Sequence, residues 1–191
     1  MKIDKGQPGY IQYRKKKLLF MTLLEFAVVI ALLVLGIIQT GTRLNLLTVV
    51  AIVGCLPACK MLVGLITILP YQTADPEVVE EIENKASLLT TAYDTIITSR
   101  ERIMPVTAVV IAGNTVFGYA PDKKTDPEEA AKHIKNILED NRISKVTVKI
   151  LRDYTPFLAR VEGLNNIAQI EKEDRKRREQ KIRKIILNIS M

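Results

Sequence analysis

The chain has few of the residues from which enzyme sites and disulfide frameworks are built. Its 191 residues include one histidine and two cysteines. Cys55 and Cys59 both lie inside a long apolar run, so disulfides do not hold the rest of the chain together, and cysteine use does not indicate an oxidising compartment. His133 stands beside lysines with no carboxylate or serine at catalytic spacing, and we interpret it as an exposed helix residue.

Sequence motifs for phosphate and metal chemistry are also missing. The sequence contains no glycine-rich phosphate loop, no metal-ligand cluster and no nucleophile elbow. We therefore expect no cofactor and no metal, and the absence of these motifs weighs against an enzyme.

Long apolar runs, in contrast, are abundant. Residues 18–38 and 44–69 form runs of 21 and 26 residues, and Pro70 ends the second. At about 1.5 Å per residue, either run as a helix crosses a hydrocarbon core of about 30 Å. The connection between the runs is short, so the two helices must be antiparallel neighbours. The sequence therefore predicts a two-helix transmembrane hairpin over residues 18–70.

The charges that flank the runs predict the orientation of the hairpin. Residues 1–17 contain six basic residues and one acid, whereas the connection contains only Arg43. The positive-inside rule places such an N-terminus in the cytoplasm, and two spans return the rest of the chain there. A cleaved signal peptide is the alternative, but the first run is too long and no small-residue cleavage site follows it. We expect a protein of the cytoplasmic membrane, with both termini inside and with four residues against anionic lipid headgroups: Arg14, Lys15, Lys16 and Lys17.

Each apolar run contains one charged residue. Glu25 and Lys60 lie at equal distances from the middle of the connection, so in an antiparallel hairpin they fall at one depth. An isolated charge inside a membrane costs about 2.5–3.5 kcal/mol, which favours an ion pair between the two. Alternatively, Lys60 snorkels to the interface while Glu25 is protonated, or both belong to an ion pathway in an oligomer.

The net charge of +7 is unevenly distributed along the chain. From residue 71 onward there are 20 basic and 19 acidic residues, of which residues 171–184 hold 8 and 4. The remainder of this part therefore has 12 basic and 15 acidic residues, a slightly acidic balance. A protein that grips nucleic acid broadly is basic over its folded surface, so we do not expect nucleic acid as a partner.

Helix signals occur twice after the hairpin. Asp75 and Asp126 are N-cap residues that each precede a proline, and Glu129 completes a capping box with Asp126. The apolar positions that follow have helical spacing, and the second helix is expected over 127–140.

Strand signals lie between and after these helices. The apolar runs 104–112 and 115–120 flank a two-residue turn, and 145–151 alternates as a half-buried strand. Residues 89–98 are compatible with helix or strand, and their β-branched side chains favour a strand from about Tyr93. Residues 75–165 therefore predict an α/β domain in the order helix, three strands, helix, strand, helix, with a turn at 154–157.

The last part of the chain, 166–191, predicts a long charged helix that begins after Gly163. Residues 171–181 contain no apolar residue, and four acids each have a base four positions on, which stabilises an isolated helix: Glu171–Arg175, Glu173–Arg177, Asp174–Arg178 and Glu179–Arg183. An apolar cluster then ends the chain. We expect this cluster to dock a protein partner, another copy of the tail or the membrane, with a last core helix as the alternative; its residues are Ile182, Ile185, Ile186 and Ile189.

One resemblance concerns the element order. Helix, three strands, helix and strand is similar to the core of restriction-endonuclease-like nucleases, some of which are membrane-tethered. That family places an acid on one strand and an acid-x-lysine motif at the end of the next, where they hold a divalent metal and activate water. Here Asp94 and Asp122-Lys123-Lys124 occupy roughly these places, although the motif lies after its strand and Ala120 stands at the matching position within it. The resemblance implies a metal-dependent nuclease that uses Asp94, Asp122 and Lys124, or an inactive relative; an ordinary charged turn is the alternative.

The sequence thus predicts four parts: a basic N-terminal segment 1–17, the hairpin 18–70, an α/β domain 75–165 and a charged helix 166–191. The function that we predict is a membrane-anchored, non-catalytic binding or scaffolding module. A membrane-tethered nuclease-like domain is the alternative.

Overall fold

A computed structural model describes residues 3–99, 102–170 and 175–191 of the chain. It forms two compact units, one made of Ile11–Gln72 and the other of Met1–Tyr10 together with Thr73–Met191. Two long apolar helices are followed by a small mixed four-stranded sheet with helices, as the sequence predicts.

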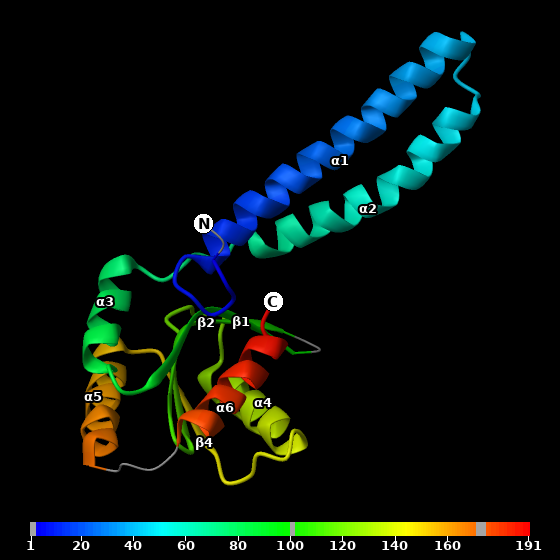
Figure 1. The fold of residues 1–191 in the computed structure, drawn as a ribbon. Coiled ribbons are helices and arrows are strands. Elements are labelled where there is room, and N and C mark those ends of the chain that lie inside the picture. The colour runs from blue at the N-terminus through cyan, green and yellow to red at the C-terminus, as the bar shows by residue number, and fades with distance from the viewer. Residues whose placement is uncertain (1–2, 100–101, 171–174) are drawn as a thin grey trace. The chain divides into compact units, whose positions relative to one another are not determined.

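The first unit is a helical hairpin (Figure 1). Helix α1 spans Tyr10–Thr40 and helix α2 spans Leu46–Ile68. Helix α1 begins eight residues before the apolar run, because the basic segment continues as helix. Asn45 caps α2: its side chain accepts a hydrogen bond of 2.8 Å from the backbone N–H of Thr48.

The two helices meet along a seam of mostly small residues. Every seventh residue is buried on each helix, which is the spacing of a coiled-coil contact. Gly54 lies opposite Val29, since a methyl group on Gly54 would stand 3.4 Å from Val29 Cγ2. The buried seam residues are Thr22, Val29 and Gly36 on α1 and Ala51, Ala58 and Leu65 on α2.

The second unit is built on a mixed sheet in the order β1-β2-β3-β4. Strands β1, β2 and β3 are antiparallel neighbours, and β4 runs parallel to β3 after a crossover through helix α4. Gly113 makes the turn between β2 and β3 at φ +56°, a conformation that glycine adopts without strain. The strands are β1 Thr90–Thr98, β2 Ile103–Ala112, β3 Thr115–Tyr119 and β4 Thr147–Leu151.

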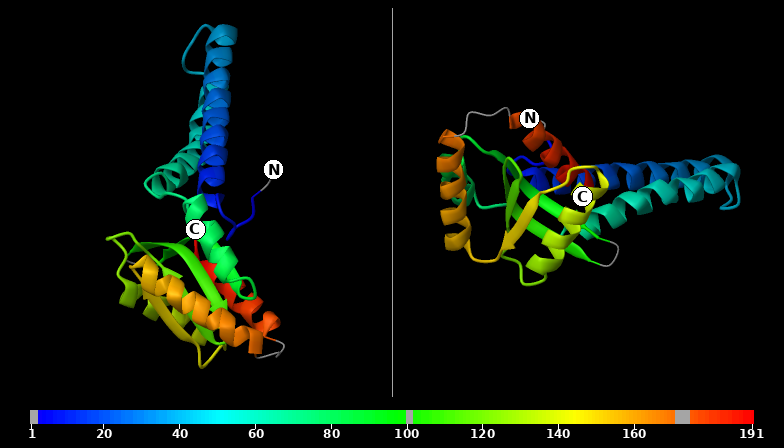
Figure 2. Two further views of the ribbon diagram at one scale, coloured as in Figure 1. Left: turned by 90° about the vertical axis from the view of Figure 1, so that its left-hand side faces the viewer. Right: turned by 90° about the horizontal axis from the view of Figure 1, so that it is seen from below.

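Helices cover both faces of this sheet, so the unit has three layers (Figure 2). Helices α3 (Pro76–Lys85) and α5 (Tyr154–Ile170) pack on one face around Tyr93, Phe117 and Phe157. Helices α4 (Pro127–Asp140) and α6 (Lys176–Ile189) pack on the other face. The core on that side includes Met104, Val109, Ile111, Ile134, Leu138, Ile182 and Ile186.

The end of the chain differs from its prediction in two ways. The expected turn at 154–157 is the first turn of α5, and this helix continues through Gly163, which has open space around it. Helix α6 does not project into solvent but lies on the sheet, with Ile182 and Ile186 fully buried. Burying an isoleucine side chain stabilises the folded state by about 1.5–3 kcal/mol. Packing of this cluster on the sheet is therefore favoured over its exposure to water.

Both ends of the α/β unit cover the outer edge of β1. The backbone N–H of Tyr93 donates to Gly6 O at 3.0 Å, and that of Met191 donates to Ile96 O at 2.9 Å. Exposed strand edges invite pairing with other chains, and this edge is filled from within the molecule. Residues up to Tyr10 group with the α/β unit, and α1 begins at Tyr10, whereas the sequence placed the boundary of the N-terminal segment at residue 17.

Candidate functional site

The α/β unit contains a basic cleft between the loop after α4 and helix α6. The cleft has a volume of about 370 Å³. Of the six lining residues that the structure describes, four are cationic and none is acidic. The loop contributes Arg142, Ile143 and Ser144, and α6 contributes Arg177, Arg178 and Lys181.

The loop side of the cleft is the C-terminal cap of α4. The N–H of Ile143 donates to Leu138 O and the N–H of Arg142 donates to Glu139 O, both at 2.9 Å. This pair of bonds is the Schellman motif, whose left-handed position is usually glycine. Here that position is Arg142, with φ +63°. A left-handed non-glycine residue costs about 1–2 kcal/mol, so the arginine stands where the backbone alone favours another residue.

The helix side of the cleft is the first turn and a half of α6. Arg178 is fixed to the loop, because its Nη2 donates to Ser144 O at 2.9 Å. Arg177 and Lys181 are exposed and lie one turn apart on the same face. The N-terminal end of a helix carries a partial positive charge, which adds to that of these side chains and favours a bound anion.

Asp94, the first predicted metal ligand, is a buried structural residue. Its Oδ1 accepts a hydrogen bond of 2.8 Å from the N–H of Ala74, and its Oδ2 accepts one from the hydroxyl of Thr73. Thr73 Oγ1 also accepts from the N–H of Gly9 at 3.1 Å. Gly9 and Thr73 are the points at which the chain leaves and re-enters the α/β unit, so Asp94, which is 2 % exposed, joins both to β1.

Asp122 and Lys124 lie in the loop between β3 and α4. The Oδ1 of Asp122 accepts a hydrogen bond of 2.9 Å from the N–H of Lys124, which closes an ordinary polar turn. Within residues 3–99, 102–170 and 175–191, no three histidine, cysteine, aspartate or glutamate side chains group together as metal ligands. The nuclease hypothesis thus stays a prediction without a ligand cluster in the described chain.

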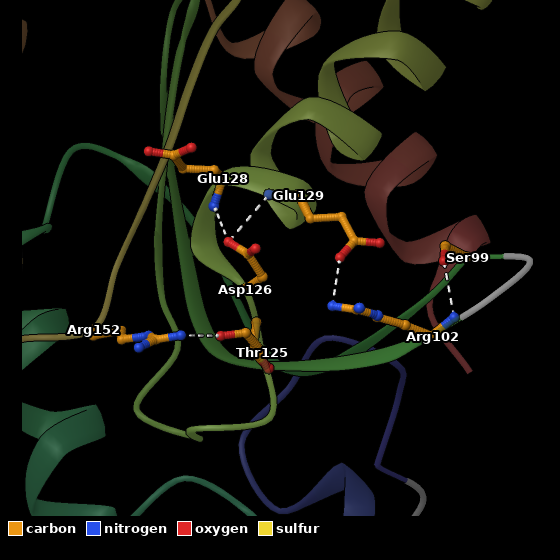
Figure 3. A network of polar contacts seen from close by, with 7 residues as sticks. All are labelled: Ser99, Arg102, Thr125, Asp126, Glu128, Glu129 and Arg152. Atoms are coloured by element: carbon orange, nitrogen blue, oxygen red, sulfur yellow. Dashed lines mark hydrogen bonds and ion pairs between the residues drawn. The ribbon is translucent and has the colours of Figure 1, made fainter.

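The polar network that follows this turn is structural (Figure 3). Arg152 Nη2 donates to Thr125 O at 3.0 Å, and Asp126 Oδ1 accepts from the N–H of Glu128 at 3.0 Å. The expected capping box is only half present, because the Glu129 carboxylate pairs with Arg102 at 3.0 Å. These contacts fix the start of α4 against β2 and β4.

Glu25 and Lys60 do not form an ion pair in the described part of the chain. Val29 faces Gly54, so one turn earlier on α1 Glu25 faces Ala58. Lys60 lies two residues beyond Ala58, about 200° around the helix, and its side chain is exposed. Glu25 Oε2 is buried without a hydrogen-bond partner. The predicted pair therefore requires a different register from the one that this structure has.

The residues predicted to contact lipid headgroups lie in the first two turns of α1. Lys16 and Lys17 are exposed, whereas Arg14 and Lys15 are half-buried. Lys15 Nζ donates to Leu69 O at 2.7 Å, so it caps the C-terminal end of α2 within the hairpin. Headgroup contact stays a prediction for this segment, with Lys16 and Lys17 as the accessible residues.

The predicted docking residues are part of the core instead. Ile182 and Ile186 are fully buried, and Ile185 and Ile189 are partly buried against the same cluster. Helix α6 is therefore a last core helix, which was the alternative prediction to a cluster that docks a partner. The acids Glu171, Glu173 and Asp174 lie outside the described residues.

Glu179 differs from the interpretation of α6 as a solvated helix. It is 4 % exposed, its Oε1 accepts from the N–H of Gly113 at 2.7 Å, and its Oε2 accepts from Thr90 Oγ1 at 2.8 Å. Arg183 is not its partner but donates through Nε to Thr91 O at 2.9 Å. Both side chains of this predicted pair attach α6 to the start of β1.

Sequence reasoning did not find the basic cleft. Its loop and helix residues are about 35 positions apart, and the basic residues of α6 fit equally well on a solvated helix. A polar residue pair after a predicted helix end, Asn141-Arg142, was the available local signal. No protein-family model, no curated protein and no solved structure matches this chain.

Proposed function

We propose that this protein is a membrane-anchored, non-catalytic binding module, in which α1 and α2 cross the cytoplasmic membrane and the α/β unit lies in the cytoplasm. The membrane anchor is supported by the position of the exposed apolar side chains in the chain. Of 22 exposed large apolar side chains in the described chain, all but Leu88 and Ile167 lie on residues 19–69. Such a surface supports the placement of both helices in lipid.

The burial of the two helices supports the same proposal. In an apolar 18-residue segment of each helix, only 11 % of α1 and 17 % of α2 is buried inside the molecule. The core helix of a soluble protein is mostly covered by its neighbours, whereas a membrane helix presents apolar side chains to lipid on most of its surface.

Binding is favoured over catalysis by the kinds of polar contact that the α/β unit makes. Buried Asp94 and Glu179 each have both carboxylate oxygens engaged in structural hydrogen bonds. The part of the cleft lining that the structure describes offers cations and a hydroxyl but no acid, base or nucleophile pair. A tethered unit with a charged concave site is suited to holding a ligand near the membrane surface.

Alkaline carbonate extraction of membranes tests the anchor. The full chain is expected to stay in the membrane pellet at high pH, where peripheral proteins are released. Recovery of the chain in the supernatant would contradict the anchor.

Cysteine labelling tests the orientation. In a background of Cys55→Ala and Cys59→Ala, Arg43→Cys places a thiol in the connection between α1 and α2, and Lys149→Cys places one at an exposed position of β4. A membrane-impermeant maleimide added to intact cells is expected to label Arg43→Cys, and to label Lys149→Cys only in opened vesicles. The reverse pattern would show that the α/β unit is outside.

A further inference from the structure

Three arginines and one lysine surround a hollow of about 370 Å³ on an otherwise slightly acidic unit. Like charges in such proximity repel one another, and the described lining contains no acid to neutralise them. Two of the arginines extend from the first turn of α6, where the helix dipole makes a cation less favourable still. An anion bound in the cleft would offset the repulsion among the cations and would itself interact favourably with the N-terminal end of α6.

The kind of anion follows from the donors. Guanidinium groups bind planar or tetrahedral oxyanions through two parallel hydrogen bonds, and phosphate accepts several such bonds at once. The cleft volume lies within the range of small-molecule sites, about 300–1,000 Å³. A nucleic acid needs a basic surface that extends well beyond one cleft, and here the unit outside residues 171–184 has a slightly acidic balance.

We infer that the cleft between the loop after α4 and helix α6 binds a small phosphate-bearing anion through Arg142, Arg177 and Lys181, with Arg178 holding the loop in place. This inference rests on the proposed role as a binding module, but it does not depend on the anchor. The phosphate belongs either to a soluble phosphate compound or to the phosphomonoester headgroup of a lipid, because the donors recognise the same group in both.

Substitution of Arg142 tests anion binding separately from folding, because loss of its side chain should not destabilise the fold. Arg142→Gly deletes the cation and places the preferred residue at the left-handed position of the cap. Lys145→Gly is the matched control: Lys145 is a cation in the same loop, also has φ +63°, and does not line the cleft. On α6, Arg177→Gln is paired with the control Lys184→Gln.

The experiment is calorimetric titration of inorganic pyrophosphate into the full chain in phosphatidylcholine nanodiscs. The wild type is expected to bind, and Arg142→Gly and Arg177→Gln should each weaken binding about tenfold through loss of a charge-assisted contact. The two controls should stay within about twofold of the wild type. No binding by the wild type at about 10 mM pyrophosphate, or an equal loss in all four variants, would overturn the inference.

A competition arm identifies the source of the phosphate. Vesicles that contain phosphatidic acid are added to the titration, with phosphatidylcholine vesicles as the control. Competition by phosphatidic acid alone supports the site with a lipid headgroup as ligand, and absence of competition supports the site with a soluble ligand. Carbonate extraction of the same membranes reports on the anchor, so failure of the ligand and failure of the proposed function are distinguishable.

Discussion

The hairpin and the α/β unit use apolar residues in opposite ways. Helices α1 and α2 expose most of their large apolar side chains and bury a narrow seam, whereas the α/β unit buries such side chains on both faces of its sheet. The buried polar groups differ as well. Glu179 has a partner for each carboxylate oxygen, while Glu25 Oε2 has none in the described chain. The same type of residue should therefore have different energetic roles in the two units.

The largest expected effect concerns apolar truncation. Ile186→Ala removes a fully buried side chain between α6 and the sheet, and should lower the free energy of unfolding of the α/β unit by about 2–5 kcal/mol. Ile66→Ala on α2, where the side chain is 60 % exposed, should change the free energy of unfolding of the hairpin by less than about 0.5 kcal/mol. Urea unfolding in micelles, followed by circular dichroism, measures both. Equal losses would mean that the two units do not differ in packing.

A smaller effect is expected for buried Glu179 and for Glu25, which is half-buried with its Oε2 covered. Glu179→Ala leaves the N–H of Gly113 and the hydroxyl of Thr90 without their acceptor, which should cost about 1–3 kcal/mol. Glu25→Ala removes an oxygen that has no partner, so the hairpin should be unchanged or more stable. Thermal melting of both variants in nanodiscs makes the comparison. A loss at Glu25 as large as that at Glu179 would indicate a partner for Glu25, such as the predicted Lys60.

Glycine substitution sharpens the comparison further. Gly6 has φ +85° and a methyl group there would stand 2.8 Å from Leu187 Cδ2, so Gly6→Ala should cost about 1–2 kcal/mol and loosen the N-terminal segment from β1. Gly64 lies within α2 with open space around it, and Gly64→Ala should be neutral or slightly stabilising. Hydrogen exchange at the N–H of Tyr93, which donates to Gly6 O, measures the loosening. Unchanged protection would show that the segment does not depend on Gly6.

The smallest effect at neutral pH is expected for Tyr93→Phe. The Tyr93 hydroxyl is buried and makes no well-formed hydrogen bond in the described chain, so its removal should change stability by less than about 0.5 kcal/mol at pH 7. Burial raises the pKa of Tyr93 from 10.0 to about 12; the nearby Thr91 side chain opposes this shift, and the charge of Glu83 adds to it.

The sign of the pH dependence follows from that shift. The folded state favours the neutral phenol, so the contribution of Tyr93 is fully present below pH 10.0 and is lost as the pH rises towards 12. Unfolding free energies measured from pH 8 upward should therefore fall less steeply in Tyr93→Phe than in the wild type. Identical slopes would contradict this effect of burial.

Local signals accounted for much of the fold. Asp75 and Asp126 correctly marked the starts of α3 and α4, because proline after a capping residue is a short-range signal. The two-residue turn at Gly113 joined β2 and β3 as expected, and within 89–98 the residues Thr90–Thr98 proved to be strand. The expected turn at 154–157 was wrong. Helix α5 is stabilised by packing against α3 and the sheet, and these tertiary contacts cannot be recognised from the sequence of 154–157.

The candidate site was much less predictable. Asp94 was selected as a metal ligand on a pattern of spacing, and the structure instead surrounds its carboxylate with Thr73 and Ala74. The proximity of Arg142 and Arg177 could not be predicted, because nothing in the sequence of either segment indicates that the loop contacts the distant helix. Which charged residues converge is a property of the packing, not of their spacing along the chain.

By itself, the sequence determined the two long apolar helices, the order of the sheet elements and the excess of basic residues near the C-terminus. These features depend on periodicity, caps and composition, which act within a few residues. Only the tertiary structure decided that Ile182 and Ile186 are core, that Glu179 attaches α6 to the sheet and that four cations share one cleft. An apolar face looks the same in sequence whether it meets a partner or its own sheet, and only the folded chain shows which surface covers it.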